Sequence, residues 1–181
     1  VTLGDGVSTE NLIFDGLNLE FTDRNDQEIG SISIAKEDLG TTKTTEILYS
    51  KISDISNIII TDTKQLYTVT TSEADFDDET HTMALEIQSF SVNTSENSIS
   101  GADSVYAEDT NSFSVQGTWG SYIDEWVIED NTAKAEFSDS KNTNTSCVIK
   151  AANGNETAFT LIAKAKGNEI ARKQIDVIRK D

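Results

Sequence analysis

The chain has very little of several residue types on which many protein functions depend. It has 181 residues but no proline, one cysteine, one histidine and one methionine. Because Cys147 is the only cysteine, no disulfide can form within the chain. Because His81 is the only histidine, zinc sites that use two or more histidines are excluded. No apolar run approaches the roughly 18 residues that a transmembrane helix needs, so we expect no membrane insertion.

Basic residues are also scarce, since the chain has 14 Lys and Arg against 32 Asp and Glu, a net charge of −18. Such a field repels nucleic acid, which we therefore do not expect as a partner. Residues 1–92 carry five basic and 18 acidic residues, whereas residues 93–181 carry nine and 14. This change in charge predicts two domains, 1–92 and 93–181. The first residue is Val1, so the chain is expected to be either a mature product or a fragment.

Alternation of apolar and polar residues dominates the first half of the chain. Segments 16–23 and 28–35 alternate on either side of a polar, Asx-rich turn and predict a hairpin. Further strands are predicted at 56–63, 65–72 and 81–92, the last with a slip at Ser89 and Phe90 that indicates a bulge or the end of the domain. Segment 44–55 instead has Leu48, Ile52 and Ile55 at helical spacing, which leaves a short helix and a strand open. We interpret the first domain as β-rich, with or without one short helix.

Seven strands are predicted in the second half, at 97–107, 111–117, 124–130, 133–139, 145–151, 158–166 and 170–178. Short strands at regular spacing, joined by Asn- and Gly-rich turns, are typical of an all-β sandwich. The inward-facing side chains are expected to be Phe113, Val115, Trp126, Ile128, Ala135, Phe137, Cys147, Ile149, Phe159, Leu161, Ala163, Ile175 and Val177. The fold class predicted for the whole chain is therefore mainly β, with two β domains.

No pattern of catalytic residues accompanies the histidine or the cysteine. The chain has no G-x-S-x-G segment, and its ten glycines are scattered rather than gathered in a phosphate-binding loop. Cys147 is expected on an inward-facing strand position, where a thiol behaves as a small apolar side chain. We therefore predict that the protein is not an enzyme and needs no organic cofactor.

An acidic run at 73–81 is the first candidate site. Asp75, Asp77, Asp78 and Glu79 offer the oxygen ligands that Ca²⁺ prefers, so calcium is the one metal ion that we consider. Their spacing does not match an EF-hand loop, and a solvated acidic loop is the alternative.

Two aromatic residues form the second candidate site. Trp119 and Tyr122 lie in a predicted loop next to Gly120, where exposed rings can stack on sugars or anchor an interface. The alternative is a tryptophan that folds over the sandwich and is buried.

Residues 97–178 carry a series of segments in a recognisable order: "SISGADSVY", "FSV", "WVIED", "TSCVIKAANGNETAFTLIAKAKG" and "KQIDVI". In this order and pattern the segment resembles a bacterial immunoglobulin-like domain of the Big type. The resemblance implies an immunoglobulin-like β-sandwich and gives no catalytic residues to transfer.

Domains of that type occur in phage tail and virion proteins and in bacterial surface proteins, so the resemblance also implies a function. We expect a non-enzymatic structural or interaction protein, namely a phage tail component with a terminal module for weak surface adhesion. Its partners would be other virion or surface subunits, including further copies of the chain, or carbohydrate. The alternative is a bacterial cell-surface adhesin or carbohydrate-binding module, and the expected location is the virion or the outer cell surface.

Overall fold

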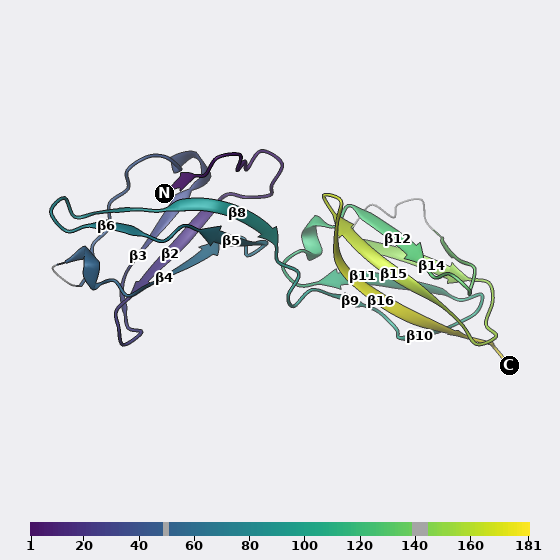
Figure 1. Cartoon of the computed structure of the whole chain (residues 1–181). Coiled ribbons are helices and arrows are strands. Elements are labelled where there is room, and N and C mark those ends of the chain that lie inside the picture. The colour runs from purple at the N-terminus through teal and green to yellow at the C-terminus, as the bar shows by residue number, and fades with distance from the viewer. Residues whose placement is uncertain (49–50, 139–144) are drawn as a thin grey trace. The chain divides into compact units, whose positions relative to one another are not determined.

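The computed structural model, which describes residues 1–48, 51–138 and 145–181, is built of β-strands and short 3-10 turns (Figure 1). The chain separates into two compact units, Val1–Asn93 (unit 1) and Thr94–Asp181 (unit 2). The boundary lies one residue after the position that the change in charge indicates. The mainly β fold class with two β units is confirmed.

Unit 2 consists of two four-stranded sheets. One has the order β13 (Ala135–Phe137), β14 (Ser146–Ala151), β11 (Thr110–Gln116), β9 (Ser98–Ser100), and the other has β10 (Ser104–Tyr106), β16 (Asn168–Ile178), β15 (Thr157–Ala165), β12 (Glu125–Glu129). When the strands are lettered along the chain, with β9 as A and β10 as A′, the sheets read D-E-B-A and A′-G-F-C. This is the strand arrangement of a constant-type immunoglobulin sandwich. Unit 2 is therefore an immunoglobulin-like β-sandwich, as the sequence predicted.

The segment 97–107, predicted as one strand, is in fact two strands that belong to different sheets. Strand β9 pairs antiparallel with β11, whereas β10 pairs parallel with β16. Between them Gly101 has φ +139°, and a Cβ at this position would lie 2.4 Å from the ring of Phe113. A glycine is required there because a larger residue would be strained and would clash. The chain thus changes sheets at Gly101, and the strand prediction was wrong at this point.

The core of unit 2 follows the predicted alternation. Phe113 on β11 and Phe159 on β15 are buried, and their ring centroids lie 6.5 Å apart at 90°. This ring pair joins strands B and F, which a disulfide joins in antibody domains. Trp126 is 2% exposed on β12, opposite Ala163 on β15, as expected of a core residue on strand C. Two residues predicted to face inward are only half-buried: Ile128, next to the end of β12, and Phe137, at the end of β13.

Unit 1 contains two three-stranded sheets and a separate hairpin. The sheets have the orders β3 (Glu28–Ala35), β2 (Gly16–Thr22), β4 (Asn57–Asp62) and β1 (Thr2–Leu3), β8 (Glu86–Val92), β5 (Tyr67–Thr71), and the hairpin joins β6 (Asp75–Asp77) to β7 (Thr82–Ala84). The predicted hairpin is confirmed as β2 and β3. The predicted slip corresponds to a shift of register in the β5–β8 pairing, where Gln88 of β8 is paired with no residue of β5. Leu17, Leu19 and Phe21 of β2 share one core with Ile87 of β8.

The segment 44–55 forms neither of the two elements considered for it. Its described residues contain only the 3-10 turn η2 (Ile52–Asp54), and residues 49–50 lie outside the described residues. Leu48 is 81% exposed whereas Ile55 is buried, so the two do not share an apolar helix face. Thr44 and Thr45 at the start of the segment disfavour a helix, because β-branched side chains lose rotamer freedom in a helix.

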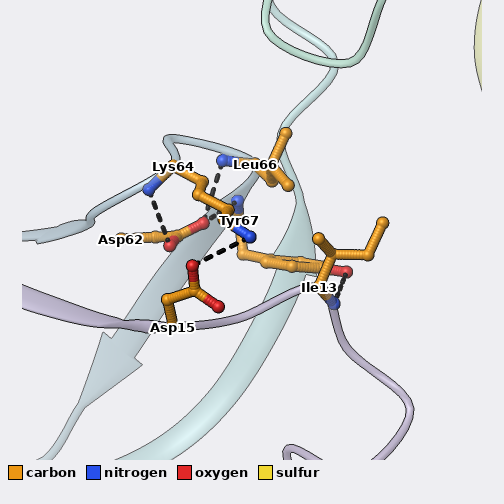
Figure 2. A network of polar contacts seen from close by, with 6 residues as sticks. All are labelled: Ile13, Asp15, Asp62, Lys64, Leu66 and Tyr67. Atoms are coloured by element: carbon orange, nitrogen blue, oxygen red, sulfur yellow. Dashed lines mark hydrogen bonds and ion pairs between the residues drawn. The ribbon is translucent and has the colours of Figure 1, made fainter. Parts of the chain in front are cut away.

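A buried carboxylate holds the corner where the chain passes from one sheet of unit 1 to the other (Figure 2). Asp62, at the end of β4, is 1% exposed. Its Oδ1 accepts a hydrogen bond from the backbone N–H of Lys64 at 3.1 Å, and its Oδ2 accepts from those of Leu66 at 2.9 Å and Tyr67 at 3.1 Å. The Tyr67 hydroxyl in turn accepts from the backbone N–H of Ile13 at 3.1 Å. One side chain thus satisfies three donors and connects β4 to β5.

Predicted site residues and a candidate binding cavity

Trp119, the first residue of the predicted aromatic site, is fully buried in unit 2, with 0% of its surface exposed. Its backbone N–H donates to Oδ1 of Asn97 at 2.9 Å. Gly117 nearby has φ +117°, and a Cβ there would lie 2.5 Å from the same Asn97 oxygen. In this conformation the indole has no free face on which a sugar could stack. The structure therefore shows the alternative interpretation, a loop tryptophan folded into the sandwich.

Tyr122 ends the 3-10 turn η3 (Gly120–Tyr122) and is half-buried. Its ring meets that of Trp119 edge to face, with centroids 6.2 Å apart at 79°. Part of the Tyr122 side chain remains exposed, and its ring packs on the buried ring of Trp119. The contribution of Tyr122 to binding stays a prediction.

The predicted calcium residues lie in the β6–β7 hairpin of unit 1, and two of them already act as hydrogen-bond acceptors. Oδ1 of Asp77 accepts from the backbone N–H groups of Glu79 at 2.9 Å and Thr80 at 3.1 Å. Asp78 accepts from the backbone N–H of Ser53 at 3.0 Å and from its hydroxyl at 2.6 Å, so it fastens the hairpin to η2.

These hydrogen bonds favour the ionised carboxylates. The side chain of Thr80, followed by backbone N–H groups, lowers the pKa of Asp77, and the side chain of Ser53 lowers the pKa of Asp78. Within the described ranges the structure does not gather three or more His, Cys, Asp or Glu side chains where a metal ion could bind. This arrangement agrees with the solvated acidic loop, the alternative interpretation, and calcium binding stays a prediction.

The thiol of Cys147 is unsuited to nucleophilic chemistry. The residue is 3% exposed, on β14 opposite Phe113 of β11. Burial raises the pKa of the Cys147 thiol to about 12, so the thiol stays protonated at neutral pH. Its role is that of a small core residue.

Unit 1 contains a cavity of about 660 Å³ that the sequence analysis did not predict. Its floor is the inner face of β2 and β3, with Leu19, Phe21, Ile32 and Ile34, and one wall comes from the β6–β7 hairpin. Residues 40–45 and 80–82 also line it and are exposed, so we call them the rim. Volumes of roughly 300–1,000 Å³ are typical of small-ligand pockets. Segments far apart in the sequence form this cavity, so no local pattern indicates it.

The rim of the cavity is rich in hydroxyl groups and free of carboxylates. Seven threonines line the cavity, four of them from the segment 41–45. Lys43 and His81 also line it, but no Asp or Glu does. This absence is notable because residues 1–92 include 18 acidic residues. The cavity is thus a neutral to positive hollow in an otherwise strongly negative unit.

No family model matches the chain, and no curated protein matches it. Among solved structures, the chain is similar to the crystal structure of murine CEACAM1b, with 16% sequence identity and a TM-score of 0.26. The match covers 92% of this chain and 87% of that chain. A TM-score this low carries no argument, so the immunoglobulin-like assignment of unit 2 rests on its strand order and its core. Within the described residues no helix is long and apolar enough to cross a membrane.

Proposed function

We propose that the protein is a non-enzymatic structural or interaction protein and that unit 2 is its binding module. The interior of this immunoglobulin-like sandwich is filled by Trp119, Trp126 and the ring pair of Phe113 and Phe159. A partner of unit 2 therefore has to bind the outer surface of the sandwich or its loops.

One observation on that surface carries the proposal. Tyr106 of β10 and Ile178 of β16 are direct partners in the parallel ladder, and they are 49% and 42% exposed. Residues paired in this way point to the same side of the sheet. The preceding pair, Val105 and Val177, is buried, so the alternation turns Tyr106 and Ile178 outward. We call these two residues the edge patch, because β10 is the outer strand of its sheet.

An exposed tyrosine next to an exposed isoleucine suits protein–protein contact. Tyrosine is enriched at interfaces, where its ring contributes a large contact area at a low entropic cost. An edge strand also offers backbone groups to a further strand. The edge patch thus supports association with another subunit.

More specifically, we propose that the protein is a phage tail component whose partners are other virion subunits, including copies of this chain. Its support is the resemblance of residues 97–178 to Big-type domains of virion and surface proteins. The net charge of −18 favours solubility and disfavours nucleic acid as a partner.

Light scattering coupled to size-exclusion chromatography of the full chain tests this proposal. We expect mass to rise with protein concentration, and negative-stain microscopy to show rings or tubes. The double variant Tyr106→Ser with Ile178→Ser should return the protein to monomers. The control Gln174→Ala, on the same strand and the same outward side as Ile178, should still associate. A strict monomer at high concentration would count against the virion proposal.

The alternative function, a bacterial surface adhesin or carbohydrate-binding module, has separate support in the accessible rings of Tyr106 and Tyr122. Binding to a glycan array should then be lost in Tyr122→Ala or Tyr106→Ala and retained in Ser114→Ala. Absence of binding to any glycan would reject carbohydrate as the partner.

A further inference from the structure

We propose that the cavity of unit 1 binds a small organic anion with an apolar body, of which a medium-chain carboxylate is the simplest example. This inference concerns unit 1 alone and does not depend on the function proposed for unit 2.

The charges around the cavity select an anion over a cation. None of the residues that line the cavity is acidic, whereas Lys43 lies on its rim. Elsewhere the negative field of unit 1 repels anions, because residues 1–92 have 18 acidic and five basic side chains. An anion is therefore repelled less at the cavity than at the acidic surface around it, and a cation finds many competing carboxylates outside the cavity.

Lys43 has hydrogen-bonding capacity left for a ligand. Its Nζ lies 2.8 Å from Oδ2 of Asp38, and the two side chains are 40% and 33% exposed. An ammonium group has three N–H donors, of which this ion pair uses one. Ion pairs this accessible contribute little, so a carboxylate of the ligand can share the ammonium without a large loss. Asp38 itself does not line the cavity.

His81 supplies a second donor on the rim, since an imidazole has at least one N–H in either protonation state. The residue is exposed and lies between the strands of the β6–β7 hairpin with φ 54°. Thr80 and Thr82 flank it, and both also line the cavity. The groups on the rim that can donate hydrogen bonds to the carboxylate of the ligand are thus one ammonium, one imidazole and several hydroxyls.

The floor suits an apolar body rather than a second polar group. Leu19, Phe21 and Ile34 form the deep part and are almost fully buried. Ile32 and Met83 are half-buried at the sides, where an alkyl chain or a small ring can cover them. Covering this surface removes apolar area from water, which favours binding. The threonines of the rim carry both a methyl group and a hydroxyl, so they can contact either part of such a ligand.

Isothermal titration of the full chain with decanoate, decanol and decylamine, each below its micelle concentration, tests the proposal. We expect decanoate to saturate at one molecule per chain, decanol to bind more weakly and decylamine not to bind. Lys43→Gln should weaken decanoate about tenfold, since a charge-assisted hydrogen bond is lost, and should leave decanol unchanged. Arg24→Gln, which removes one exposed cation of the same unit outside the cavity, should leave decanoate binding unchanged.

A second variant locates the bound body of the ligand. Met83→Trp adds volume in the cavity and should abolish binding of both decanoate and decanol. Thermal unfolding verifies that this variant is folded, and Thr80→Trp at the exposed rim replaces it if it is not. The proposal is overturned if decanoate does not bind, or if decanol or decylamine binds as tightly as decanoate. It is also overturned if Lys43→Gln leaves decanoate affinity unchanged, or if the folded tryptophan variant still binds.

Discussion

Units 1 and 2 have a similar strand pairing at their ends but differ in what occupies the space between their sheets. In both units an early short strand pairs parallel with the last strand, β1 with β8 and β10 with β16. In unit 2, large rings from both sheets occupy the interior. In unit 1, the face of β2 and β3 borders a cavity of about 660 Å³. A parallel pairing with the last strand is therefore compatible both with an interior filled by large rings and with a core that borders a cavity.

The corners where the chain changes sheets also differ. Unit 2 changes sheets at Gly101, whose lack of a side chain leaves room for the ring of Phe113. Unit 1 changes sheets next to Asp62, a buried carboxylate that accepts three backbone hydrogen bonds. Unit 2 thus depends on apolar packing and unit 1 on a buried polar group, and the two should respond to different substitutions.

The largest expected effect is that of removing either tryptophan of unit 2. Trp126→Ala and Trp119→Ala should each lower the free energy of unfolding of unit 2 by about 3–5 kcal/mol, because each leaves a large buried void. Each unit has its own core, so scanning calorimetry should show the unit 2 transition moving while that of unit 1 stays in place. If Trp119→Ala leaves stability unchanged, Trp119 is not a core residue and the ligand-binding interpretation returns.

Removal of Asp62 should have the next largest effect and should act on unit 1 alone. Asp62→Ala leaves three backbone N–H groups without their acceptor, and we expect a loss of about 3 kcal/mol. Asp62→Asn keeps an acceptor oxygen and should lose less. Asp54→Ala, an exposed carboxylate of the same unit, is the matched control in urea unfolding followed by circular dichroism. A cost as small as that of Asp54→Ala would show that the corner is held by other contacts.

Local patterns in the sequence predicted the strands and much of the core, because alternation along a strand reports directly which side chains face inward. Phe113, Trp126 and Phe159 follow from this rule. The change of sheet within 97–107 did not follow, since alternation continues across Gly101 and only the close approach of Phe113 reveals the need for glycine.

The sites were harder to predict, because they depend on contacts between distant segments. The loop of Trp119 is bound by Asn97, 22 residues earlier in the chain, whose side chain accepts from the backbone N–H of Trp119. The acceptors of the acidic run are occupied partly by Ser53, 25 residues before Asp78. The cavity combines the segment 40–45 with strands β2, β3 and β7, which no local pattern connects.

A smaller effect, of opposite sign, is expected at the end of β2. Among the residues described, the hydroxyl of Thr22 is buried without a hydrogen-bond partner. Thr22→Val replaces it by a methyl group of similar shape, so unit 1 should gain about 1 kcal/mol. The matched control is Thr68→Val at an exposed strand position, which should change the urea midpoint much less. A loss of stability in Thr22→Val would mean that the hydroxyl binds an ordered water molecule.

The contact between η2 and the β6–β7 hairpin should be measurable as a change in pKa. Ser53→Ala removes the hydroxyl that lowers the pKa of Asp78 most, so this pKa should rise towards the ordinary value of about 3.9. A lowered pKa stabilises the fold above the unfolded-state pKa, and that contribution disappears as the pH falls through the folded-state pKa. The pKa of Asp77 should not change, because its donors are Thr80 and Glu79. Carbon-detected NMR titration of the carboxyl groups distinguishes the two residues.

The smallest expected effect is that of calcium on unit 1. A Ca²⁺ ion requires six to eight oxygen ligands, and Asp77 and Asp78 already accept hydrogen bonds within the hairpin and from Ser53. We expect 1 mM calcium to change the melting temperature of unit 1 no more than 1 mM magnesium does, since both screen the negative charge equally. If the Kd for calcium were a hundredfold below that concentration, binding would add about 2.7 kcal/mol to the free energy of unfolding. The melting temperature would then rise by several degrees. Such a rise, absent with magnesium and lost in the double variant Asp77→Asn with Asp78→Asn, would establish the site and show that the hairpin can exchange its hydrogen bonds for a metal ion.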